Sequence, residues 1–139
     1  MKKQLSQLKT GLTGSAEILV DSRHTALHVG SGRQKILATP VLITLMETAA
    51  QNAVDGSLPE GCQTIGTRLD VQHLAATPEG MRVTASAQLI GMHGRTLVFQ
   101  VSASDGHEKI GDGIHERSMI SVESFLRLLN RKSSKRSAV

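Results

Sequence analysis

The stretch "KILATPVLITLMETAAQNAVDGS" (residues 35–57) is largely apolar, yet it carries the acid Glu47 near its middle, and the next charge downstream is Asp55. On a helix, the same-side neighbours of Glu47 at i−4, i+3 and i+7 are Ile43, Ala50 and Val54, all apolar. A carboxylate on such a flank is either an ordinary exposed helix residue or a desolvated acid suited to acid–base or nucleophilic work. The second interpretation predicts that another surface, most simply a second subunit, covers this flank.

Two other polar residues could take part in the same chemistry. Thr39 stands eight residues before Glu47 and directly before Pro40, where we expect it to cap the helix. A hydroxyl there lies among unpaired N–H groups at the positive end of the helix dipole, which suits an oxyanion. His73 ends the stretch "GTRLDVQH". Both residues also have structural explanations, as a cap and as a buried histidine.

The sequence argues against a metal site, a disulfide and a membrane span. His24 and His28 have a spacing that favours metal binding only on a helix, and we expect that segment to be extended. Cys62 is the one cysteine. No apolar run reaches the roughly 18 residues of a membrane span, and the N-terminus "MKKQLSQLKT" lacks the apolar core of a secretory signal. We therefore expect a cytoplasmic protein.

Most of the net charge of +4 comes from one end of the chain. After Glu123 five lysines and arginines occur without an acid, so the remainder is close to neutral. The segment "NRKSSKRSAV" has the composition of a disordered tail. With Phe99 and Phe125 as the chain's only Phe, Tyr or Trp residues, the protein lacks the stacking aromatics of nucleic-acid sites, which argues against that partner.

A helix must carry Glu47, and its apolar positions define the buried face. The expected helix begins at Thr39-Pro40 and ends before Gly56. The residues with the spacing of a buried helical face are Val41, Leu42, Leu45, Met46, Ala49, Ala50, Ala53 and Val54.

Strands must supply the rest of the core. The pattern predicts a first strand at 15–21, followed by an extended segment at 23–29. After the helix the apolar period becomes two, which predicts strands at 63–76, 81–91, 95–105 and 108–122. We interpret these four as a meander beside one covering helix, an α+β fold. The predicted organisation is an N-terminal extension (1–12), one domain (13–130) and a basic flexible tail (131–139).

Three segments carry a resemblance to a known family. "ATPVLITLMETAA", "GTRLDVQHLAATPEG" and "VSASDGHEKIGDGIHER" resemble the hot dog thioesterases of the fluoroacetyl-CoA thioesterase type, and the similarity runs from about Leu19 to Lys132. The combination of T-x7-E on the helix, G-x6-H on the following strand and H-E-R on the last strand is specific, whereas each motif alone is weak.

The resemblance implies both a fold and an activity. It implies a hot dog fold, in which one long central helix is wrapped by an antiparallel sheet of about five strands. It also implies hydrolysis of a short-chain acyl-CoA without a cofactor, coenzyme A being part of the substrate. The family's Thr–Glu–His constellation falls on Thr39, Glu47 and His73, and its substrate contacts fall on Gly66 and Arg117. The enzyme is implied to be a homodimer, or a tetramer built from dimers, with the site between subunits.

One position departs from the family pattern. The fluoroacetyl enzyme has a gating phenylalanine about six residues before its threonine, whereas Arg33 stands near that place here and no aromatic lies nearby. This difference puts fluoroacetyl selectivity in question and leaves thioester hydrolysis intact. Arg33 is instead a candidate substrate contact, and with Lys35 and Arg82 a candidate for the coenzyme A phosphates.

Two other functions remain open from the sequence. An acyl-CoA hydratase or dehydratase could use Asp70 with His73, although Glu47 would then have no part. A non-catalytic acyl-CoA-binding module would use Thr39 only as a helix cap.

Overall fold

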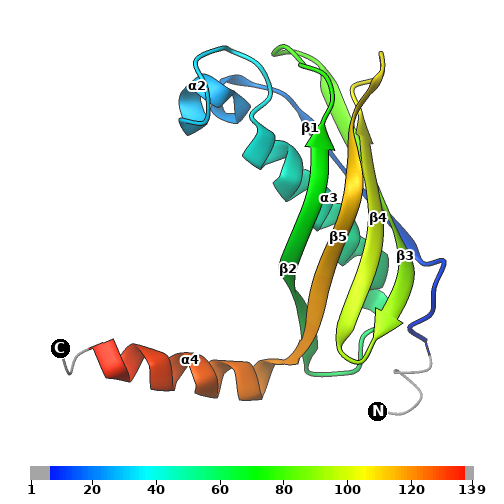
Figure 1. Cartoon of the computed structure of the whole chain (residues 1–139), viewed down its shortest axis with the longest axis vertical. Helices are drawn as coiled ribbons and strands as arrows, with labels where there is room; N and C mark the ends of the chain where they lie inside the picture. Colours follow the sequence, from blue (N-terminus) through cyan, green and yellow to red (C-terminus); the bar gives the residue numbers. More distant parts are fainter. Residues whose placement is uncertain (1–6, 137–139) are drawn as a thin grey trace.

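The structure, a computed structural model, describes residues 7–136. Helix α3 lies along one face of a curved antiparallel sheet, and helix α4 projects from the lower end of the body (Figure 1). The elements in chain order are β1 (Thr13–Leu19), η1 (Ser22–His24), α2 (Ala26–Val29), α3 (Thr39–Val54), η2 (Asp55–Ser57), β2 (Cys62–His73), β3 (Arg82–His93), β4 (Thr96–Ser104), β5 (Lys109–Ser121) and α4 (Val122–Arg136). The predicted α+β class is confirmed.

The core forms between α3 and the inward side chains of the central strands. Seven of the eight predicted apolar positions of α3 are buried, and Val41 is half-buried. Alternate residues of β3 and β4 meet them, and the inward positions are Val83, Ala85, Ala87, Leu89, Leu97, Phe99, Val101 and Ala103. At the sheet edge, β1 approaches α3 so closely that a Cβ on Gly14 would collide with the helix backbone at Ala49 and Ala53.

The strand order is β1-β3-β4-β5-β2, so the predicted four-strand meander is wrong. Strands β3, β4 and β5 do form a meander, but β2 pairs with β5 at one edge and β1 pairs with β3 at the other. Alternation of apolar residues shows which side of a strand is buried and says nothing about its neighbour, which explains the error. One side of β2 consequently has no strand beside it in the described part of the chain.

The predicted extended segment 23–29 is also wrong. It forms η1 and α2, two short helical turns. The Asp21 side chain accepts a hydrogen bond from the Arg23 N–H, and Thr25 Oγ1 accepts one from the His28 N–H. These side chains cap the turns, and Gly30, at φ +95°, ends the second. The first strand begins at Thr13, two residues before the predicted start.

The basic C-terminal segment differs from the predicted flexible tail. Residues 131–136 continue α4, and residues 137–139 lie outside the described part, as do residues 1–6 of the predicted N-terminal extension. Helix α4 leaves Leu126, Leu128 and Leu129 exposed. Among the described residues, no helix combines the length and the apolar character that crossing a membrane requires.

Candidate active site

Thr39 and His73 meet at the N-terminal end of α3. The N-cap of this helix is Ala38, which makes no side-chain cap, so the predicted capping role of Thr39 is wrong. Its hydroxyl instead lies 2.7 Å from His73 Nδ1, at the end of β2. The Thr39 residue is exposed, so the pair is open to a substrate. A hydroxyl beside an imidazole is an arrangement that activates an oxygen nucleophile.

The connection between β2 and β3 holds these two residues together. The Thr77 carbonyl accepts a hydrogen bond from the Leu37 N–H at 2.8 Å, two residues before Thr39. Thr77 is itself buried, and its hydroxyl donates to Asp105 Oδ2 at 2.9 Å. The loop after His73 is therefore tied both to the start of α3 and to the β4–β5 turn.

The environment of His73 favours a neutral ring. Burial lowers its pKa from 6.5, and the backbone of Ala75 opposes part of that change. Its Nε2 atom is buried and has no hydrogen-bond partner among the described residues. A neutral imidazole can accept a proton from the Thr39 hydroxyl at neutral pH.

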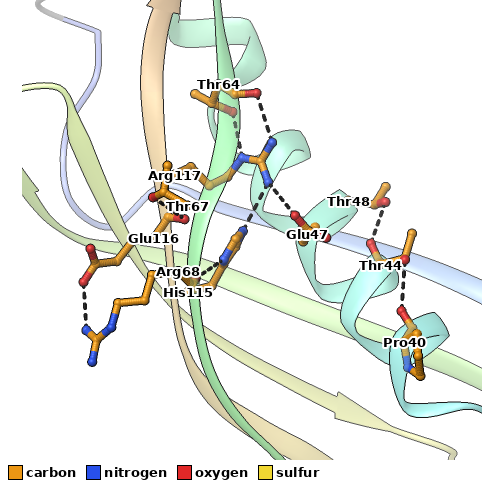
Figure 2. Close-up of polar contacts among 10 residues, drawn as sticks. All are labelled: Pro40, Thr44, Glu47, Thr48, Thr64, Thr67, Arg68, His115, Glu116 and Arg117. Carbon is orange, nitrogen blue, oxygen red and sulfur yellow. Dashed lines mark hydrogen bonds and ion pairs between the residues drawn. The ribbon is translucent and has the colours of Figure 1, made fainter. Parts of the chain in front are cut away.

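Glu47 belongs to a second polar cluster, centred on Arg117 of β5. Arg117 Nη1 lies 3.5 Å from Glu47 Oε2, while Nε donates to Thr64 Oγ1 at 2.8 Å and Nη2 donates to the Thr64 carbonyl at 3.0 Å (Figure 2). The arginine side chain is 3% exposed and that of Glu47 is 32% exposed. The buried cation therefore faces a carboxylate that solvent or a ligand can reach.

Gly66 lies opposite Arg117 in the β2–β5 pairing. A Cβ at this position would collide with Glu47 Oε2 and would lie 3.4 Å from Arg117 Nη1. The missing side chain thus leaves the space that the carboxylate occupies. The structure brings Gly66, Glu47 and Arg117 together, as it does Thr39 and His73.

Within one chain these two clusters stay apart. Thr39 and Glu47 are eight residues apart on α3, which corresponds to about 12 Å along the axis of an α-helix. Thr39, Ile43 and Glu47 are successive positions four apart, so they lie along the same side of the helix. A single chain thus presents the predicted Thr–Glu–His set as two separate clusters.

The other predicted contacts lie elsewhere. Arg33 and Lys35 are exposed on the loop between α2 and α3. Arg82 pairs with Glu17 across β1 and β3, at 3.2 Å. Asp70 is three residues from His73 on β2, and such residues point to opposite faces of a strand.

Sequence reasoning assigned no role to Thr64 and His115, although both contact Arg117. His115 Nε2 lies 3.1 Å from Arg117 Nη1, and His115 is fully buried. The signal was present in "HER", because residues two apart on a strand share a face. For Thr64 no comparable signal exists, since pairing of β2 with β5 was not predicted.

The fold and the comparisons with known proteins identify a thioesterase of the hot dog class. A solved fluoroacetyl-CoA thioesterase superposes with a TM-score of 0.83 at 34% identity, over 90% of this chain and 97% of that one. A hypothetical thioesterase-superfamily protein from Thermus thermophilus gives a TM-score of 0.88 at 24% identity, over 94% and 97% of the two chains, and supports the fold. The expected hot dog fold is thereby confirmed.

The family follows from the sequence match. The model of the family described as fluoroacetyl-CoA-specific thioesterase matches residues 20–123, and the chain belongs to this family. The fluoroacetyl-CoA thioesterase of Streptantibioticus cattleyicolor is 43% identical over 91 residues, a match that spans 66% of this chain and 66% of that protein.

Proposed function

We propose that the protein hydrolyses a short-chain acyl-CoA to the free acid and coenzyme A, using Thr39, His73 and Glu47 at a site shared by two copies of the chain. The observation that carries this proposal is the 2.7 Å contact between the Thr39 hydroxyl and the His73 ring. Coenzyme A is part of the substrate, and the proposed chemistry uses no cofactor.

In this proposal Thr39 is the nucleophile and neutral His73 is its base. The hydroxyl proton passes to His73 Nδ1 as the threonine oxygen bonds to the thioester carbonyl carbon. The C–S bond then breaks, and the histidine returns the proton to the coenzyme A thiolate. Water hydrolyses the resulting acyl-threonine ester by the same proton transfers in reverse. The Glu47 carboxylate stabilises the imidazolium while it carries the proton.

A two-fold symmetry axis would bring the Thr39–His73 pair of one copy beside Glu47 of the other. Ile43 lies midway between Thr39 and Glu47 on the same side of α3, and it is only half-buried. An axis passing near Ile43 would place Glu47 of one copy beside Thr39 of the other, twice per dimer. The unpaired side of β2 supports the same assembly, because exposed edges of this length are usually covered.

Part of the α3 flank that was expected to need a second subunit is already covered within one chain. We expected the whole flank of Ile43, Glu47, Ala50 and Val54 to need cover, but Ala50 and Val54 are already fully buried within one chain. The proposed interface on α3 is therefore centred on Ile43 and Glu47.

The hydratase alternative loses its acid–base pair. Asp70 and His73 lie on opposite faces of β2, and the Asp70 side chain is 75% exposed. The binding-module alternative gives no reason for the Thr39–His73 contact.

Thiol release from acetyl-CoA and butyryl-CoA, measured beside enoyl-CoA absorbance, tests the proposed activity. Release of free thiol supports hydrolysis. Loss of enoyl absorbance without thiol release would show a hydratase, and silence in both assays would leave an acyl-CoA-binding module.

Subunit complementation tests the shared site. Thr39→Ala and Glu47→Gln homodimers should each be nearly inactive. Random mixing of the two chains should restore roughly a quarter of the wild-type activity, because half of the dimers are mixed and each has one intact site. The Thr39→Ala/Glu47→Gln double variant, mixed with wild type, is the control for subunit exchange. Activity that does not recover on mixing, or a monomeric mass near the 14.9 kDa chain by light scattering, would refute the shared site.

A further inference from the structure

We propose that His115 is a positioning residue for the active site: its Nε2 lone pair fixes the guanidinium of Arg117, which in turn holds the Glu47 carboxylate. This inference rests on the proposed function, because Glu47 matters here only if it takes part in hydrolysis.

The contacts of His115 define one tautomer. Its Nδ1 lies 2.8 Å from the Arg68 carbonyl, which can only accept a hydrogen bond, so Nδ1 carries the proton. Its Nε2 lies 3.1 Å from Arg117 Nη1, which can only donate, so Nε2 carries the lone pair. Both contacts are satisfied together only by the neutral ring with its proton on Nδ1.

The surroundings keep the ring in that state and place. His115 is fully buried, and its ring stacks on that of Phe99 with 6.2 Å between centroids. Burial lowers the pKa of His115, the Arg117 cation lowers it further, and the Arg68 carbonyl opposes both effects. A protonated ring could not accept from Arg117 and would set two cations side by side.

Thr64 and His115 contact the Arg117 guanidinium more closely than Glu47 does. The Thr64 contacts of its Nε and Nη2, at 2.8 and 3.0 Å, and the His115 contact of Nη1 are all shorter than the 3.5 Å contact with Glu47. Nη1 is shared between His115 and the carboxylate, as Figure 2 shows. The fixed guanidinium therefore sets where the carboxylate lies, and the reverse does not hold.

A histidine that merely fills space would be replaceable by any side chain of similar volume. The positioning role predicts something more specific, namely that the acceptor at Nε2 must be kept. A glutamine amide extends as far as Nε2 and can accept from Arg117. An asparagine amide extends only to Nδ1 and can donate only to the Arg68 carbonyl. A leucine fills the site without any polar atom.

Activity measurements on these three variants test the role. We expect His115→Asn and His115→Leu to lower kcat by about 10- to 100-fold, the cost of a misplaced catalytic group, with a smaller change in KM. His115→Gln should recover most of kcat. Unfolding by urea, followed in parallel, shows whether each variant is folded under assay conditions. Equal kcat for the Gln and Asn variants would overturn the proposal.

A double-mutant cycle separates this role from a general one. If His115 acts through Arg117 on Glu47, then His115→Leu should add little to the loss caused by Glu47→Gln. If the activity loss of the double variant equals the product of the two single losses, the proposal is overturned. If Glu47→Gln alone keeps full activity, the Glu47 part of the proposed function fails, and with it the positioning role.

One measurement does not depend on activity. Long-range ¹H–¹⁵N NMR of the His115 ring at pH 7 should show the neutral tautomer with its proton on Nδ1. A ring protonated on Nε2, or a charged ring, would overturn the proposal even if hydrolysis were confirmed. If the ring shows the expected tautomer but the chain has no thioesterase activity, the failure lies in the proposed function and not in the hydrogen bonding of His115.

Discussion

At the scale of single residues, the site depends on what surrounds each polar group more than on the group itself. Glu47 lies over Gly66, beside a buried arginine, on a helix whose other inward positions are apolar. The same carboxylate on an open surface would be an ordinary exposed residue. The sequence alone could not distinguish an exposed Glu47 from one beside a buried arginine.

Replacing Glu47 by glutamine keeps its size and polarity and removes its charge. We expect Glu47→Gln to lower kcat by about 10²- to 10⁴-fold, the usual range for acid–base groups. Melting temperature should stay the same or rise, because a partly buried amide costs less than a carboxylate. Glu17→Gln, on the exposed face of β1, is the matched control: it should leave kcat unchanged, and losing its surface ion pair with Arg82 should change stability by less than about 1 kcal/mol. Lost activity together with lost stability would indicate a structural carboxylate.

Substrate selectivity is the second prediction at this scale. Arg33 occupies the region in which the family's gating phenylalanine is expected, and it is exposed. We therefore expect kcat/KM for fluoroacetyl-CoA to be within about 10³-fold of that for acetyl-CoA, a margin of roughly 4 kcal/mol in transition-state energy. Parallel steady-state kinetics on the two thioesters measure this ratio, and a larger preference would show that another residue provides the gate.

At the scale of elements, the packing of α3 against the sheet positions both Thr39 and Glu47. β1 can lie against this helix only because Gly14 has no side chain. The atoms that an added Cβ would meet belong to the helix backbone, which cannot rotate out of the way.

Gly14→Ala should therefore lower the free energy of unfolding by about 1–3 kcal/mol, the usual cost of overpacking. Urea denaturation measures this change. Gly56→Ala is the control, because a Cβ there meets nothing within 4 Å, and it should leave stability unchanged or slightly raised. Equal stability of the two variants would show that β1 can shift at little cost.

The elements were largely predictable and their neighbours were not. The period of the apolar residues predicted α3 and the four later strands, because burial on one face determines that period. It could not show that β2 pairs with β5, and so it could not predict that Thr64 would hold Arg117. Asp21 and Thr25 are residue types that commonly cap helical turns, and in the structure they cap η1 and α2, two helical turns where the prediction has an extended segment. Of the site, Thr39 and His73 could be paired only by resemblance, and His115 was missed.

At the scale of the whole molecule, two histidines, the half-buried His73 and the fully buried His115, link stability to pH. Burial lowers the pKa of both His73 and His115 from 6.5, so the unfolded chain binds more protons than the native chain as the pH falls below about 6.5. Stability should consequently be lower at pH 5.5 than at pH 7.5, by at most about 1.4 kcal/mol for each histidine. Urea unfolding at the two values measures this, and His115→Gln should reduce the difference. Greater stability at pH 5.5 would contradict the assignment.

The projecting end of α4 makes a separate prediction. Truncation after Asn130 removes four cationic residues from the end of α4, a helix that projects from the body (Figure 1). The rate of hydrolysis should stay within about threefold of the full chain, less than ~1 kcal/mol. A much larger loss, concentrated in KM, would mean that this end of α4 binds the coenzyme A phosphates.

The position of β2 at the sheet edge also sets the order in which the site can form during synthesis. The ribosome releases β2 before β3 and β4, yet its partner β5 is the last strand to emerge. Gly66 and His73 on β2 must therefore remain without their native neighbour on the growing chain, and Arg117 arrives with β5 to close the sheet. Pairing of distant segments is slow because the intervening chain must first be ordered. The contact between Glu47 and Arg117 therefore cannot form until β5 has been made. Until then β2 lacks its native neighbour, and an unpaired strand edge favours aggregation.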